Sequence, residues 1–86
     1  MRQMVQNHKA HHPETPVDKV LRVFGSARAS HIAGLTTEAV RKWNRRVSTG
    51  GQGGLVPSRY QALYLNEARA RGLELDAEDF IAEPLR

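Results

Sequence analysis

The chain has 86 residues, no cysteine and a formal net charge of +4. A chain of this length holds a single small hydrophobic core, and the absence of cysteine excludes disulfides and thiolate metal sites. No apolar run approaches the roughly 20 residues of a membrane-spanning helix, and residues 1–10 lack the hydrophobic segment of a secretory signal, so we expect a cytoplasmic protein without membrane contact.

Charge is distributed unevenly along the chain. Residues 1–71 contain twelve Lys and Arg against four Asp and Glu, whereas residues 72–86 contain one against five. This asymmetry predicts a basic working surface and an acidic C-terminal segment that is held away from it.

The first predicted element is a helix that follows a flexible N-terminal tail, residues 1–15, which is polar and aperiodic. Thr15 can cap this helix, Pro16 suits its first turn, and Gly25 ends it. One apolar stripe at helical spacing defines its inner face: Val17, Val20, Leu21 and Phe24.

Residues 26–46 predict two short helices joined by a glycine turn. Ser26 is placed to cap the first helix, residues 27–33, whose small side chains allow another helix to approach closely. Gly34 supplies the turn, because a positive φ is least costly for glycine. The second helix is predicted over residues 37–46.

This second helix has one apolar face and one basic face. Thr36 is its expected cap, and Leu35 and Val40 are placed as a hydrophobic staple around that cap. The buried face is predicted to contain Val40, Trp43 and Val47. The outer face is left with four cations: Arg41, Lys42, Arg45 and Arg46.

The chain continues with a loop and a longer helix. Residues 48–54, STGGQGG, predict a flexible loop. Pro57 starts a helix that stops at Gly72. Its expected inner face contains Tyr60, Leu63, Tyr64 and Ala68.

The acidic C-terminal segment, residues 72–86, is predicted to hold a short turn over 77–82 with Asp76 as its cap. This turn presents Phe80 and Ile81. On so small a domain, two exposed apolar side chains indicate a contact surface for a second copy of the chain or for another protein.

The stretch 26–46 meets the requirements of a helix–turn–helix, which needs a close helix crossing, a glycine-type turn and a second helix with one packed and one polar face. The required positions are a small residue at the crossing, the turn itself, an apolar plug beneath it and the packed face. They are occupied by Ser30, Gly34, Leu35, and Val40 with Trp43.

Residues 17–81 resemble the Cro-like helix–turn–helix regulators of phages and bacteria. The corresponding pieces are VLRVFG, ARASHIA, GLTTEAVRKW, LVPSRYQAL and LELDAEDFI. The resemblance implies an all-α, compact four- to five-helix Cro/lambda-repressor-like domain over residues 16–86. It further implies a homodimer that binds a palindromic double-stranded DNA operator and acts as a repressor or autoregulator.

The resemblance also implies roles for individual side chains. The outward positions of the second helix would face base edges in the major groove, where Arg41 is the strongest candidate for specificity because Arg can bind guanine O6 and N7 together. The full set of base-reading candidates is Thr36, Thr37, Glu38, Arg41 and Lys42. Phosphate contacts are expected from Ser26, Arg28, Arg45, Arg46 and Arg59, and the amides of the glycine-rich loop are placed to join them.

No catalytic or metal-binding set is apparent. The chain lacks a cysteine nucleophile, paired carboxylates on a shared face and a coherent Ser-His-Asp set, so we expect no enzymatic activity. His8, His11 and His12 are suitable ligand types for zinc or nickel, but no carboxylate or thiol cluster completes a site, and we expect neither metal nor cofactor.

Two functions from different classes stay open. The first is the sequence-specific DNA-binding regulator described above, which the basic helix favours. The second is an antitoxin-like or anti-activator module that contacts a protein partner through residues 72–86.

Overall fold

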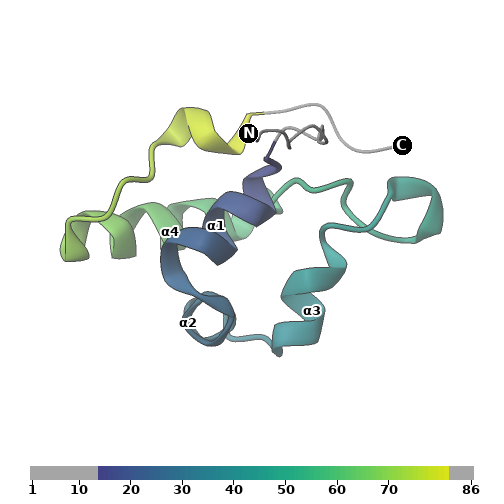
Figure 1. The fold of residues 1–86 in the computed structure, drawn as a ribbon, viewed down its shortest axis with the longest axis horizontal. Helices are drawn as coiled ribbons and strands as arrows, with labels where there is room; N and C mark the ends of the chain where they lie inside the picture. The colour runs from purple at the N-terminus through teal and green to yellow at the C-terminus, as the bar shows by residue number, and fades with distance from the viewer. Residues whose placement is uncertain (1–13, 82–86) are drawn as a thin grey trace, which may run out of the picture.

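The computed structural model describes residues 14–81, and this part of the chain is all-helical, as predicted, without a β-strand (Figure 1). Helix α2 packs against α1, α3 and α4, so the helices share one core. The α-helices are α1 (Pro16–Phe24), α2 (Ser26–Ala33), α3 (Thr37–Lys42) and α4 (Ser58–Arg71). Two 3₁₀ helices accompany them: η2 (Val47–Thr49) and η3 (Ala77–Phe80).

The predicted N-terminal tail, residues 1–15, falls only partly within the described range. Residues 1–13 lie outside it, as do residues 82–86 at the other end. Thr15 belongs to the fold, because its hydroxyl accepts the Asp18 backbone N–H at 3.0 Å and caps α1 as predicted. The Asp18 carboxylate in turn accepts the Thr15 backbone N–H at 3.2 Å, which completes a capping box.

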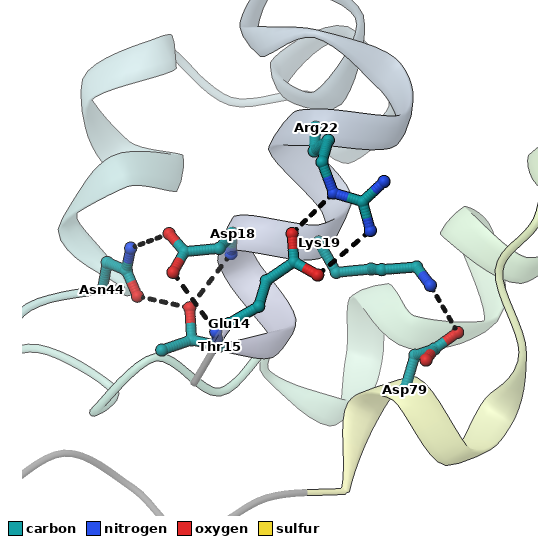
Figure 2. A network of polar contacts seen from close by, with 7 residues as sticks. All are labelled: Glu14, Thr15, Asp18, Lys19, Arg22, Asn44 and Asp79. Carbon is teal, nitrogen blue, oxygen red and sulfur yellow. Dashed lines mark hydrogen bonds and ion pairs between the residues drawn. The ribbon is translucent and has the colours of Figure 1, made fainter. Parts of the chain in front are cut away.

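Asn44, just beyond α3, ties the end of that helix to the start of α1 (Figure 2). Its side-chain Nδ2 donates to Asp18 Oδ1 at 2.7 Å, and the Thr15 hydroxyl donates to Asn44 Oδ1 at 2.8 Å. The three side chains are partly buried, so water has limited access to their polar atoms. Each side chain therefore depends on the others for its hydrogen bonds. This polar junction therefore sets where α3 stands relative to α1.

The core contains aliphatic and aromatic side chains from all four α-helices and from the C-terminal segment. Tyr64 of α4 is fully buried, and its hydroxyl donates to the Ala29 backbone carbonyl of α2 at 2.7 Å. Burial raises the pKa of Tyr64 to about 12, so the phenol stays protonated and able to donate. The buried apolar residues are Val17, Val20, Ala29, Val40, Trp43, Val56, Tyr64, Ala68, Leu75 and Phe80.

Helix α3 is shorter than its sequence predicts. The prediction of a helix over 37–46 is wrong beyond Lys42, where α3 ends. A continuing α-helix needs each N–H to donate to the carbonyl four positions back. In the structure the N–H groups of residues 43–45 donate three positions back instead, to the carbonyls of residues 40–42 at 3.0–3.1 Å. The helix therefore ends in a tighter turn, and the carbonyls of Trp43 and Arg45 accept N–H groups of the returning chain at 2.8 and 2.7 Å.

Val47 consequently lies outside α3, and the prediction that it shares a buried stripe with Val40 and Trp43 is wrong. Val40 is fully buried and Trp43 nearly so, whereas Val47 is 56% exposed. Trp43 stacks on Tyr60 of α4, with ring centroids 5.1 Å apart. Trp43, the residue directly after α3, therefore makes the apolar contact with the core that ends this helix.

The glycine-rich segment 48–54, which its composition predicts to be a flexible loop, is hydrogen-bonded to the chain that follows α3. The backbone N–H groups of residues 50–54 all donate to carbonyls of residues 43–47. At Gly51 a Cβ atom would collide with the Arg45 backbone carbonyl, so only glycine fits there. Glycine in this segment permits close backbone packing rather than freedom of movement.

The C-terminal segment contributes to the core. Leu75 and Phe80 are each only 5% exposed, so the prediction that Phe80 is presented to a partner is wrong. Ile81 is exposed as predicted. The turn is the 3₁₀ helix η3, which ends at Phe80 rather than at residue 82 and is capped by Asp76 as expected. Phe80 is buried because η3 packs back onto α1 and α4.

Two further predictions are wrong. Leu63 is 45% exposed rather than inward, because α4 packs on α2 and η3 through a face that contains Tyr64 and Ala68. Ser26 is the first residue of α2 rather than its cap. Gly25 occupies the capping position of both α1 and α2, and the two helices follow each other without a separate capping residue.

We predict that Asn44→Ala lowers the free energy of unfolding by about 1–3 kcal/mol, because it leaves Asp18 Oδ1 without its donor and the Thr15 hydroxyl hydrogen without its acceptor. Urea unfolding followed by circular dichroism measures this change. The matched control is Asn66→Ala on the exposed side of α4, which we expect to stay within about 0.5 kcal/mol. Equal effects of the two substitutions would show that the junction is not a structural constraint.

We predict that Phe80→Ala costs about 3–5 kcal/mol of unfolding free energy, because it empties a buried aromatic site. Its neighbour provides the control: Ile81→Ala removes an exposed side chain and is expected to change stability by less than about 0.5 kcal/mol. Thermal unfolding of the two variants compares them directly. The same midpoint for both would mean that η3 is not part of the cooperative core.

Candidate nucleic-acid interface

Helices α2 and α3 are joined by a turn of three residues, 34–36. Gly34 adopts the left-handed conformation, with φ of 71°, and lets the chain reverse between the helices. The Leu35 backbone N–H donates to the Ser30 carbonyl at 3.0 Å, and the half-buried Leu35 side chain packs against the core. Thr36 caps α3, because its hydroxyl accepts the Ala39 N–H at 3.1 Å. The turn thus holds α3 at a defined angle on α2.

One face of α3 is buried and the other is open. Ser30, at the crossing, is buried and donates from its hydroxyl to the Ala27 carbonyl at 2.9 Å. Val40 and Trp43 face the core. Among the predicted base-reading residues, Thr37 is half-buried, and the others are exposed: Thr36, Glu38, Arg41 and Lys42. The structure therefore places these side chains along the six-residue helix α3 and at its N-terminal cap.

The guanidinium of Arg41 is held by the neighbouring helix. Its Nη2 donates to the Ser26 hydroxyl at the start of α2, at 3.3 Å. Two residues that are 15 positions apart in the chain, Ser26 from the predicted phosphate set and Arg41 from the predicted base-reading set, are thereby adjacent in space. Arg28, further along α2, is exposed and lines a shallow pocket with Ala27 and His31.

Beyond α3 the basic surface continues into the returning chain. Arg45 and Arg46 are exposed, and both lie outside the helix in which they were expected. Arg59, at the start of α4, is exposed and lies 5.8 Å from the centroid of the Tyr60 ring. Because Tyr60 stacks on Trp43, this guanidinium is close to the end of α3. The predicted cations thus come from three segments that adjoin one another.

Most amides of the glycine-rich loop are used within the protein. The N–H groups of residues 49–54 all donate to carbonyls of residues 43–47. The expectation that the loop amides join a phosphate contact is therefore wrong for residues 49–54. A small depression lies beside the loop, lined by Ala39, Lys42, Trp43, Gly50, Gly51 and Gln52.

Ion pairing divides the cations of residues 14–81 into those with an acidic partner and those without, and the unpaired ones include Arg69 on α4 as well as the cations of the candidate interface. Within residues 14–81 there are three ion pairs: Glu14–Arg22 at 2.7 Å, Lys19–Asp79 at 3.5 Å and Glu67–Arg71 at 2.6 Å. The hydrogen bond from Arg22 lowers the pKa of Glu14, so that pair stays charged well below neutral pH. In the same described range, no ion pair involves the exposed cations of the candidate interface: Arg28, Arg41, Lys42, Arg45, Arg46 and Arg59.

The described part of the acidic C-terminal segment, residues 72–81, lies away from these free cations. In Figure 1, the yellow segment that contains η3 lies on one side of α1, and α2 and α3 lie on the other. The ion pair of Lys19 with Asp79 fastens η3 to α1 (Figure 2). The separation of a basic surface from an acidic end, which the charge distribution predicts, is therefore present in the folded chain.

Comparison with known protein families, curated proteins and solved structures finds no match for this chain. Within the described residues, no group of His, Asp and Glu is placed to hold a metal ion, and His8, His11 and His12 lie outside that range. None of the helices in residues 14–81 is long and apolar enough to cross a membrane.

Proposed function

We propose that this protein is a sequence-specific double-stranded DNA-binding regulator of the Cro-like helix–turn–helix type, with α3 placed in the major groove. The observation that supports this proposal most is the set of exposed, unpaired cations on and directly after α3, namely Arg41, Lys42, Arg45 and Arg46. A short helix held by a tight turn with its open face charged is the arrangement that DNA recognition by this motif requires.

Within this proposal, different side chains have different tasks. Thr37, Glu38 and Arg41 lie on the first two turns of α3, where side chains reach base edges. Arg45 and Arg46 follow the helix and bind phosphates, which set the register of the protein on the duplex. The hydrogen bond between Arg41 and Ser26 restricts the guanidinium before DNA is bound, and this lowers the entropy cost of ordering it.

The regulator is proposed to act as a homodimer on a palindromic operator, with one α3 in each half-site, and to repress transcription. This part follows from the resemblance to Cro-like regulators. The alternative is a protein-interaction module that uses the acidic segment, residues 72–86, as its contact surface. Of the two apolar side chains that this segment was expected to present, Phe80 is buried in the core and only Ile81 is available to a partner or a second copy.

The proposal is tested by selecting duplexes from a random-sequence DNA pool with the full chain and measuring their affinity by fluorescence anisotropy. We expect one enriched sequence, bound at least roughly 10³-fold more tightly than a shuffled duplex of the same composition. Affinity should fall steeply with salt, because several phosphate contacts release counterions. Failure to enrich any sequence, together with equal weak binding to both duplexes, would contradict the proposal.

We predict different effects for Arg41→Ala and Arg46→Ala on the selected duplex. Loss of the base contact by Arg41→Ala should cost about 1–3 kcal/mol there and much less on the shuffled duplex, whereas Arg46→Ala should weaken both to a similar degree. Anisotropy titrations of each variant with each duplex measure the four changes. If Arg41→Ala weakens both duplexes equally, Arg41 is not a base-reading residue.

A further inference from the structure

The chain that leaves α3 forms a projecting loop with an apolar side chain on its surface. We call residues 45–50 the η2 loop, after the 3₁₀ helix that it contains. In Figure 1 this teal loop extends beyond the packed helices at one end of the molecule. Val47, the first residue of η2, has 56% of its surface exposed. Exposing an aliphatic side chain to this extent leaves apolar surface in contact with water.

The η2 loop is held in one conformation by its own hydrogen bonds. The Arg46 carbonyl accepts the Thr49 N–H, the Gly51 N–H and the Thr49 hydroxyl, each at 3.0 Å. The Val47 carbonyl accepts the Gly50 N–H at 3.0 Å. Val47 is therefore presented by an ordered turn, and its exposure does not result from an unstructured backbone.

Charge distinguishes Val47 from the other exposed large aliphatic residues of the described chain. Val47 directly follows Arg45 and Arg46, which are exposed and have no ion pair within residues 14–81. The other residues of this kind are Leu63, Leu73 and Ile81. Leu73 is followed by Glu74, and Ile81 follows the acidic η3. Leu63 lies on α4, one helical turn after the exposed Arg59. Of the four residues, only Val47 directly follows two unpaired cations in the chain, and its surface is continuous with α3.

We infer that the η2 loop enters the DNA minor groove beside the major-groove site of α3, with Val47 against the base edges and Arg45 and Arg46 on the phosphates that border the groove. This inference rests on the proposed function and adds a second recognition element to it. Apolar side chains inserted from a cationic element into the minor groove are a common way to open base steps. A protein partner would need acidic groups around an apolar pocket. The η2 loop and α3 both carry unpaired positive charge on one continuous surface, which favours DNA as the ligand of both.

The minor groove is probed by exchanging bases so that only that groove changes. Replacing adenine by 2,6-diaminopurine adds an amino group to the minor groove, replacing guanine by inosine removes one, and both leave the major-groove pattern of donors and acceptors in place. Anisotropy titrations use the full chain and the selected duplex, unmodified and with these exchanges in the base pairs flanking the α3 half-site. The variants are Val47→Ser, Val47→Leu and, as a matched exposed aliphatic control on α4, Leu63→Ser.

We expect Val47→Ser to weaken binding to the unmodified duplex about tenfold, and Val47→Leu and Leu63→Ser to change it less than about twofold. The base exchanges should alter the affinity of the unchanged chain and of Leu63→Ser, and should have little effect on Val47→Ser, which lacks the contact. Circular dichroism should show the same folded signal for every variant, because both positions are exposed.

Three results would overturn the inference. If Val47→Ser and Leu63→Ser behave alike on the selected duplex, or if the base exchanges affect Val47→Ser as much as the unchanged chain, the η2 loop does not contact the minor groove while the proposed DNA-binding function stands. If the unchanged chain binds neither the selected nor the shuffled duplex, the proposed function and the inference that rests on it both fail.

Discussion

The hydrogen bonds of Asn44 with Asp18 and Thr15 are the constraint on which the arrangement of this molecule depends. They join the residue just after α3 to the capping box that starts α1, across 26 and 29 positions of the chain. A further bond from the Val17 N–H to the Gly54 carbonyl, at 3.0 Å, brings the returning loop to the same place. The end of α3 and both ends of the following loop are thereby anchored to α1.

Two surface features follow from this anchoring. Helix α3 stops after six residues, so its exposed side chains form a compact basic face, and the next residues leave the helix axis as the η2 loop. Because the loop amides bond to carbonyls of residues 43–47, the loop projects beside that face in one hydrogen-bonded conformation. The charged side chains that neutralise one another are grouped around α1, η3 and the end of α4 instead.

The features that could be predicted from the sequence are those decided by neighbouring residues. Thr15 and Thr36 cap their helices, and Gly34 and Gly72 adopt a positive φ where helices end. Each depends on the chemistry of a few consecutive residues: a hydroxyl that reaches an N–H three positions on, or a missing Cβ. The all-helical class and the grouping of exposed cations on α3 follow from the same local patterns.

The tertiary structure alone decided where α3 ends and which apolar side chains are covered. Val47 and Leu63 continue apolar helical stripes in the sequence, and Phe80 stands among acidic residues, yet the first two are exposed and Phe80 is buried. The residues next to Asn44 in the sequence do not indicate its role, because its partners, Asp18 and Thr15, are 26 and 29 positions away. Periodicity along a chain predicts which face of a helix can be buried, but burial itself requires a second surface, and that surface is brought into place only by contacts between distant residues.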